Sequence, residues 1–287
     1  MFILIGLAVV FGSVLLGYVM HHGNVAVLIQ ISEFIIIGGA AVGSMIVGNP
    51  PSVLVGVFKD CMGLLKGNPY KKSTFSELLL MLFELFHTAK QEGMLALEPH
   101  VERPEESEIF KKYSFFTADH EAVAFLTDTM KVLLTGTVDR HDLAEILDLD
   151  LERHEEEAMT STHVLTKTGD AMPGFGIVAA VLGVVITMGS IGGAASAIGQ
   201  KVAAALVGTF LGILLAYGVF QPLAQACEGT VRCRMAYMGC IKTALLAFAR
   251  GEPPITAIEF ARRNVEPGLR PSFTDMEELI RAWKSTA

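Results

Sequence analysis

The stretch that decides the fold is AMPGFGIVAAVLGVVITMGSIGGAASAIGQKVAAALVGTFLGILLAYGVF, residues 171–220, in which one side chain, Lys201, is charged. One membrane-spanning helix needs roughly 20 apolar residues. The stretch therefore predicts two spans, at about 171–192 and 202–220, with a short turn between them.

A second apolar stretch lies at the start of the chain. Residues 1–49 carry one charge, Glu33, and predict two further spans at 1–20 and 25–47. Of the 287 residues, 52% are hydrophobic and 18% are charged, and the mean hydropathy is +0.49. A soluble domain carries about a quarter charged residues. The composition excludes a disordered or fibrous chain and indicates an all-α membrane protein with four transmembrane helices.

The charged residues lie in two polar segments. Residues 50–170 hold 12 basic and 22 acidic side chains, and residues 227–287 hold 9 and 7. We expect a large helical insert between the second and third spans at 50–170, and C-terminal helices at 227–287, with span pairs at 1–49 and 171–226. An acidic insert argues against a nucleic-acid partner, because phosphate contacts need basic clusters.

Orientation follows from the basic residues, of which 21 of 22 lie in the two polar segments. Lysine and arginine are enriched on the cytoplasmic side of membrane proteins. The insert, the C-terminal tail and the N-terminus are therefore expected in the cytosol.

Helices are also predicted inside the polar segments. The insert has an amphipathic pattern, and we expect Thr74 to cap that helix and Thr274 to cap another, because each precedes a glutamate by three residues. The apolar positions of the insert helix are Phe75, Leu78, Leu79, Leu82 and Phe86.

Small residues form one stripe on each of the third and fourth spans. Such stripes allow close helix packing, either between helices of one chain or around a second membrane protein, and both alternatives are open. The third-span stripe is Pro173, Gly176, Ala180, Gly183 and Thr187, and the fourth-span stripe is Ala205, Gly208, Thr209, Gly212 and Ala216.

Two prolines and one acid stand out in the spans. Pro173 and Pro222 lie near the cytosolic ends of the third and fourth spans, where proline kinks or ends a helix; at matching depth they predict a paired hinge. Glu33 is the one acid inside a span and is a functional candidate, although a carboxylate that reaches the interface or bonds to a neighbouring helix is the favoured interpretation. The third and fourth spans have no carboxylate, so an ion-binding acid would come from elsewhere.

Several enzyme classes lack their motifs here. The chain contains no phosphate-binding loop, dinucleotide fingerprint or nucleophile elbow. Its four cysteines and eight histidines show no zinc or iron–sulfur spacing. We therefore expect neither an enzyme nor a metal or cofactor site, and any work that the chain does is tied to an ion gradient or a partner.

The whole chain resembles the MotA family of flagellar stator subunits, within the MotA/TolQ/ExbB superfamily. The motifs are residues 34–49 (FIIIGGAAVGSMIVGN), 93–98 (GMLALE), 169–177 (GDAMPGFGI), 207–218 (VGTFLGILLAYG) and 270–273 (RPSF). The resemblance implies a multi-pass protein of the bacterial inner membrane that assembles as a pentamer around two copies of MotB. MotB would supply the aspartate that binds the translocated ion.

Site residues follow from the same resemblance. It places Pro173, Pro222 and Ala180 on or beside the ion path, and Lys90 and Glu98 against the rotor protein FliG. We assign Thr209, Tyr217 and Glu33 to the ion path as well. Lys90 stands where well-studied relatives have arginine. Sodium-driven relatives have threonine where this chain has Ala180, which predicts protons as the ion.

Two other functions remain as alternatives. An ExbB- or TolQ-like energiser would use the same gradient, but those relatives have three spans and lack the Lys90 and Glu98 region. A non-conducting membrane scaffold would use the prolines only to end helices. A secondary transporter is disfavoured, because no inverted repeat is visible.

Overall fold

The computed structural model describes residues 2–136, 139–189, 192 and 194–286. Within those ranges the secondary structure is helical, with no strand. The chain divides into two compact units, the first comprising Met1–Gly67 and Ala158–Gly229 and the second Asn68–Glu157 and Thr230–Ala287. The predicted segment borders at 49/50, 170/171 and 226/227 stay predictions. One continuous helix crosses the border at 170/171, and another crosses the border at 226/227.

The first unit begins with four helices, α1 (Phe2–Met20), α2 (Val25–Leu28), α3 (Ile31–Gly48) and α4 (Pro51–Lys66). The predicted second span, 25–47, is not one helix, because Ile29 and Gln30 are non-helical. Gln30 has an extended backbone, and its side-chain amide donates to the carbonyl of Val27 at 3.1 Å. This local bond competes with a continuous helical ladder.

The later spans are parts of helices that extend well beyond the apolar stretches. Helix α9 covers Arg140–Met188, α10 covers Ala195–Leu215, a π-helical turn covers Ala216–Phe220, and α11 covers Gln221–Ala249. The predicted end of the third span at 192 is wrong, because α9 ends at Met188 and Gly192 lies in a turn. Among the described residues, four helical stretches are long and apolar enough to cross a membrane: Phe2–Met20, Val25–Gly48 (α2 and α3 together), His141–Met188 and Ala195–Ala249.

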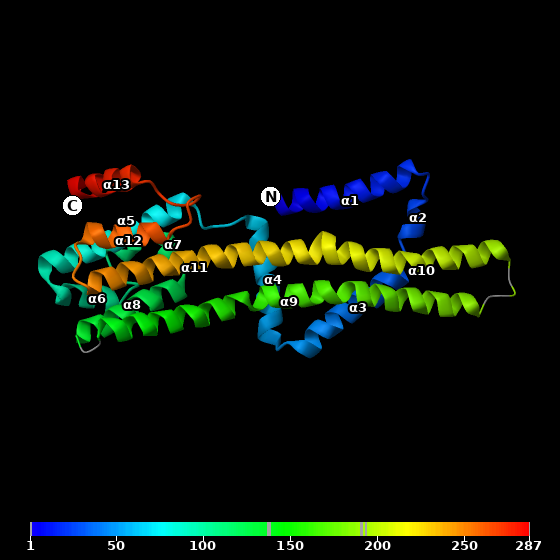
Figure 1. Cartoon of the computed structure of the whole chain (residues 1–287), viewed down its shortest axis with the longest axis horizontal. Coiled ribbons are helices and arrows are strands. Elements are labelled where there is room, and N and C mark those ends of the chain that lie inside the picture. Colours follow the sequence, from blue (N-terminus) through cyan, green and yellow to red (C-terminus); the bar gives the residue numbers. More distant parts are fainter. Residues whose placement is uncertain (1, 137–138, 190–191, 193, 287) are drawn as a thin grey trace. The chain divides into compact units, whose positions relative to one another are not determined.

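Neither proline ends a helix. Pro173 lies inside α9, and Pro222 is the second residue of α11, directly after the π-helical turn. The interpretation of the prolines as helix ends is therefore wrong. Figure 1 shows the C-terminal part of α9 beside α10 in the first unit.

The first unit has two small apolar clusters. One joins α3, α9 and α10 through Ile37, Met172, Ala179 and Leu211. The other joins α4, α9 and α11 and includes Val57. No described residue of α1 is buried. Such an apolar but uncovered helix is expected to face lipid or another subunit rather than water.

The second unit packs around a conventional core. It contains α5 (Lys72–Glu92), α6 (Glu98–Glu102), α7 (Ser114–Ala118), α8 (His120–Thr135), α12 (Pro254–Asn264), α13 (Phe273–Thr286) and parts of α9 and α11, with 3-10 turns at Met94–Leu97 and Phe110–Lys112. Helix α12 packs on α5, and Phe86 stacks on Phe248 with ring centroids 4.3 Å apart. The amphipathic stripe predicted for the insert is fully buried, which confirms that helix.

Both predicted helix caps are wrong in position. Thr74 lies inside the first turn of α5, where its hydroxyl accepts from the backbone N–H of Lys71 at 3.4 Å and donates to the carbonyl of Pro69 at 3.0 Å. At α13 the cap is Ser272 with Asp275, each accepting the other's backbone N–H at 3.0 Å. These pairs satisfy the donors that a helix start leaves free.

Candidate functional site

The small-residue stripes of α9 and α10 face each other within the chain. A β-carbon added at Gly176 would lie 2.8 Å from the carbonyl oxygen of Gly208 and 3.2 Å from Cα of Gly212, and one at Gly183 would lie 2.6 Å from Cβ of Ala205. Only glycine permits so close an approach of two helices. These residues of the two stripes therefore pack against each other inside one subunit.

Other stripe residues keep part of their surface open. Ala180, Thr209 and Pro173 are half-buried. Thr187 is buried and donates to the carbonyl of Gly183 at 2.8 Å, and Tyr217 in the π-helical turn is 61% exposed. Ala180 and Thr209 therefore form a partly exposed, open edge of these two helices. This edge is compatible with the second alternative, in which the stripes pack around a helix of another membrane protein.

The two prolines lie beside a contact between α9 and α11. Gln221 Nε2 donates to Asp170 Oδ1 at 3.2 Å, and a β-carbon at Gly169 would lie 3.1 Å from Cβ of Phe220. Proline leaves the carbonyl four residues earlier without its helical donor, and for Pro173 that carbonyl belongs to Gly169. The π-helical turn before Pro222 widens the helix at the point where the proline ring would clash.

Sequence reasoning missed Gln221 and Asp170 as part of this arrangement. Each lies directly beside a proline-bearing turn, but pairing them requires the alignment of α9 with α11. Nor did the apolar run predict the π-helical turn, because the local pattern is equally compatible with an α-helix.

The structure buries Glu33 against two neighbouring helices. Its side chain is buried, with the residue 5% exposed, and Oε2 has no hydrogen-bond partner among the described residues. A β-carbon at Gly208 would lie 2.5 Å from that oxygen, 3.0 Å from Cβ of Ala179 and 3.3 Å from the backbone nitrogen of Ala180. The carboxyl group of α3 therefore packs on the α9–α10 pair.

Lys90 and Glu98 lie on either side of a sharp turn in the second unit. Lys90 is in the last turn of α5, Gly93 follows with a φ of 92°, and Glu98 begins α6. The left-handed φ favours glycine and separates the two helices. Both charged side chains are exposed, and Leu95 between them is 76% exposed.

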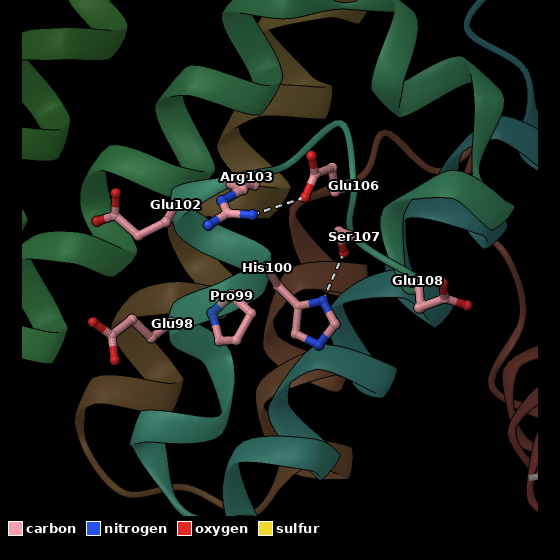
Figure 2. Close-up of a pocket in the computed structure, with 8 residues that line it drawn as sticks. All are labelled: Glu98, Pro99, His100, Glu102, Arg103, Glu106, Ser107 and Glu108. Atoms are coloured by element: carbon pink, nitrogen blue, oxygen red, sulfur yellow. Dashed lines mark hydrogen bonds and ion pairs between the residues drawn. The ribbon is translucent and has the colours of Figure 1, made fainter.

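Two shallow clefts lie at this turn. Lys90 lines one of about 380 Å³ together with Met94, Phe248 and Glu252. Glu98 lines another of about 460 Å³, drawn in Figure 2, where Glu98 and Glu102 project from α6.

The Glu98 cleft is mainly acidic. Arg103 pairs with Glu106 at 3.2 Å, and His100 Nδ1 lies 2.8 Å from the hydroxyl oxygen of Ser107 (Figure 2). Burial lowers the pKa of His100, which disfavours a positive charge on its ring. The negative charge of Glu98 is therefore left open to a basic partner.

Comparison with known proteins decides the family. Motility protein A of Salmonella typhimurium is 40% identical over 282 residues, which are 98% of this chain and 96% of that protein. The chain belongs to the MotA family. A model of the motility protein A N-terminal region matches residues 4–93, and a model of the MotA/TolQ/ExbB proton channel family matches residues 117–239.

Solved MotAB structures share the MotA fold of this chain. The C. jejuni MotAB structure has a TM-score of 0.75 at 20% identity, covering 94% of this chain and 98% of that one. The flagellar MotAB stator complex of Bacillus subtilis has a TM-score of 0.74 at 21% identity, covering 93% and 97%. These matches confirm an all-helical fold with four apolar helices.

MotA membership also separates the functional alternatives. The chain is a multi-pass motility protein of a proton channel family, and that family is not a known class of enzymes. Because the match to motility protein A extends over nearly the full length, it favours a stator over an ExbB- or TolQ-like energiser.

Proposed function

We propose that this chain, together with MotB, forms the proton-conducting stator of a flagellar motor and converts the ion gradient into torque on FliG. The observation that carries the proposal is the α9–α11 contact. Gln221 and Asp170 join the turns that precede Pro222 and Pro173, and α9 continues from Pro173 to Arg140 in the second unit. A change at the prolines can thus be passed along one helix.

MotB would supply the carboxylate that the third and fourth spans lack. Between Ala171 and Met188 in α9, and throughout α10, no carboxylate occurs. Two copies of MotB inside a pentamer of this chain would bring an ion-binding aspartate to the open edge at Ala180 and Thr209. Pro173, Pro222 and Tyr217 would respond when that aspartate gains or loses its proton.

The ion is a proton in this proposal. Sodium needs oxygen ligands, and Ala180 offers none from its side chain. One charge that crosses 100 mV releases about 2.3 kcal/mol, so each proton drives a modest step. No bound cofactor is required.

Lys90 and Glu98 would transmit torque from this chain to FliG. The polar second unit and both termini lie in the cytosol in this scheme, with the spans in the bacterial inner membrane. The exposure of Lys90, Leu95 and Glu98 on one turn supports a docking surface for charged side chains of FliG.

A deletion strain tests the proposal. Cells without the chain should assemble flagella but fail to rotate them, and the unchanged gene should restore swimming. Normal swimming with failed iron–siderophore uptake would support the ExbB-like alternative. Swimming that requires external sodium would overturn the choice of protons.

Proton conduction is tested separately. Co-expression of the chain with an unplugged MotB should acidify the cytoplasm, and Pro173→Ala should alter that leak. The absence of any partner-dependent leak would favour the non-conducting scaffold.

A further inference from the structure

Glu33 brings a carboxyl group to helices that have none of their own. It belongs to α3, yet its buried Oε2 lies where a β-carbon at Gly208 of α10 would be only 2.5 Å away, and that β-carbon would also lie 3.3 Å from the backbone nitrogen of Ala180 in α9. Ile37, one turn further along α3, is fully buried in the cluster that joins the same three helices. The carboxyl group therefore reaches the level of Ala180, where the proposed ion path lies.

No ion pair joins this carboxyl group to a cation among the residues that the structure describes. Throughout the described part of α10, and in α9 from Ala171 to Met188, the only charged side chain is Lys201, seven residues from Gly208 and thus about 10 Å along the helix. Helix α2 has no charged residue, and the charges of α4 lie more than ten residues beyond the end of α3. An ionised carboxylate without a partner costs several kcal/mol in such surroundings.

Gly208 is what admits the acid. Its missing side chain leaves the space that Oε2 occupies, since a β-carbon there would lie 2.5 Å from that oxygen. This contact places a hydrogen-bonding atom against the backbone of α10 and next to Thr209, which is half-buried. The same glycine thus allows close helix packing and leaves space for the carboxyl group of Glu33.

We propose that Glu33 is a proton-binding site within this chain, in addition to the aspartate expected from MotB. The inference rests on the proposed function, because a proton path is its context. The carboxylate takes one proton from a hydronium ion on the outer side, which leaves a water molecule, and becomes a neutral acid against Gly208. Its O–H bond later breaks and passes that proton to a water at Ala180, which becomes hydronium, and the carboxylate is restored.

Isosteric pairs test this step in vesicles that contain the chain and unplugged MotB. Glu33→Gln keeps size and polarity but cannot carry a proton, so we expect normal assembly. Its partner-dependent proton flux should be lower than that of the unchanged chain by a factor of about ten or more. Glu33→Asp should conduct more than Glu33→Asn. Ser32→Ala, at the exposed neighbouring position on α3, is the matched control and should conduct normally.

Infrared spectroscopy of the same vesicles provides a readout that does not depend on flux. The C=O absorption of protonated carboxyl groups should be stronger in the unchanged chain than in Glu33→Gln, because the aspartate of MotB contributes equally to both. Identical C=O absorption in the two chains overturns the bound proton.

The flux measurements separate two failures. Equal flux in the unchanged chain and Glu33→Gln, or in Glu33→Asp and Glu33→Asn if Glu33→Gln does not assemble, overturns proton transfer by Glu33. An unchanged chain that shows no partner-dependent flux overturns the proposed function and the transfer step with it.

Discussion

Gln221 donates its side-chain amide to Asp170 across 51 positions of sequence, at 3.2 Å between Nε2 and Oδ1. The bond joins the start of α11 to α9 one residue before Pro222 and three residues before Pro173. Because each proline weakens the backbone ladder of its own helix, a side-chain bond between them holds two deformable turns together.

Removing this bond should uncouple the turns without disrupting assembly. We expect Gln221→Leu to insert normally, because one exposed hydrogen bond contributes about 1 kcal/mol or less, but to generate less torque. Rotation of a tethered bead measures the effect. Gln225→Leu, one turn further along α11 and exposed, is the control. Equal torque from both variants would show that the bond plays no part in coupling.

A methyl group at Gly176 should separate α9 from α10. The added carbon would lie 2.8 Å from a backbone oxygen, and overpacking of this kind costs about 1–3 kcal/mol. Thermal unfolding of the purified chain should therefore occur at lower temperature in Gly176→Ala. Gly174→Ala adds the same methyl group to the same helix with nothing within 4 Å, and it should be neutral or slightly stabilising. Indistinguishable melting of the two variants would contradict this packing.

Charge at Lys90 should affect motility and leave stability alone. Lys90 is exposed and forms no ion pair with any residue that the structure describes, so Lys90→Gln breaks no ion pair of the folded chain. We expect slower swimming under viscous load and an unchanged melting temperature, whereas Lys90→Arg keeps the charge and should retain speed. Lys111→Gln, at another exposed lysine, is the control. Normal speed in Lys90→Gln would remove Lys90 from the rotor surface.

Acid should weaken the second unit through Glu259. Hydrogen bonds from Arg262, assisted by Arg263, lower the pKa of Glu259 from 4.5 to about 2. A lowered folded-state pKa gives stability that is present above pH 4.5 and is lost as the pH falls toward 2.

We expect Glu259→Gln to lose about 1–3 kcal/mol at pH 7, because Arg262 is 8% exposed and would lack its carboxylate. Denaturant unfolding at pH 7 and pH 3 measures this, and the difference from the unchanged chain should shrink at pH 3. Glu278→Gln, at an exposed acid of α13, should match the unchanged chain. A constant difference at both pH values would exclude the charge of Glu259 as the cause.

Much of the fold could be predicted because it depends on composition over about 20 residues. The apolar stretches predicted four membrane-capable helices, and the spacing of Phe75 to Phe86 predicted a buried helix face. Helix limits were less predictable. A side-chain bond of Gln30 interrupts the second span, and α9 continues far beyond the apolar stretch because charged residues are also good helix formers.

The candidate site divides in the same way. Residues such as Pro173 and Pro222 could be identified from sequence, since proline has a known effect on any helix. The surroundings of Glu33 could not, because they are formed by Gly208 and Ala179, which are more than 140 positions away.

By itself, then, the sequence determined that the chain crosses a membrane and that its acidic residues gather in a separate segment, since the cost of placing charge in a bilayer follows from residue type alone. Only the tertiary structure decided which residues of the small-residue stripes pack inside the chain, that Gln221 and Asp170 join the turns beside the two prolines, and that Glu33 is buried at Gly208. Those outcomes depend on contacts between helices distant in sequence, and helical periodicity specifies the face of a helix but not its neighbour.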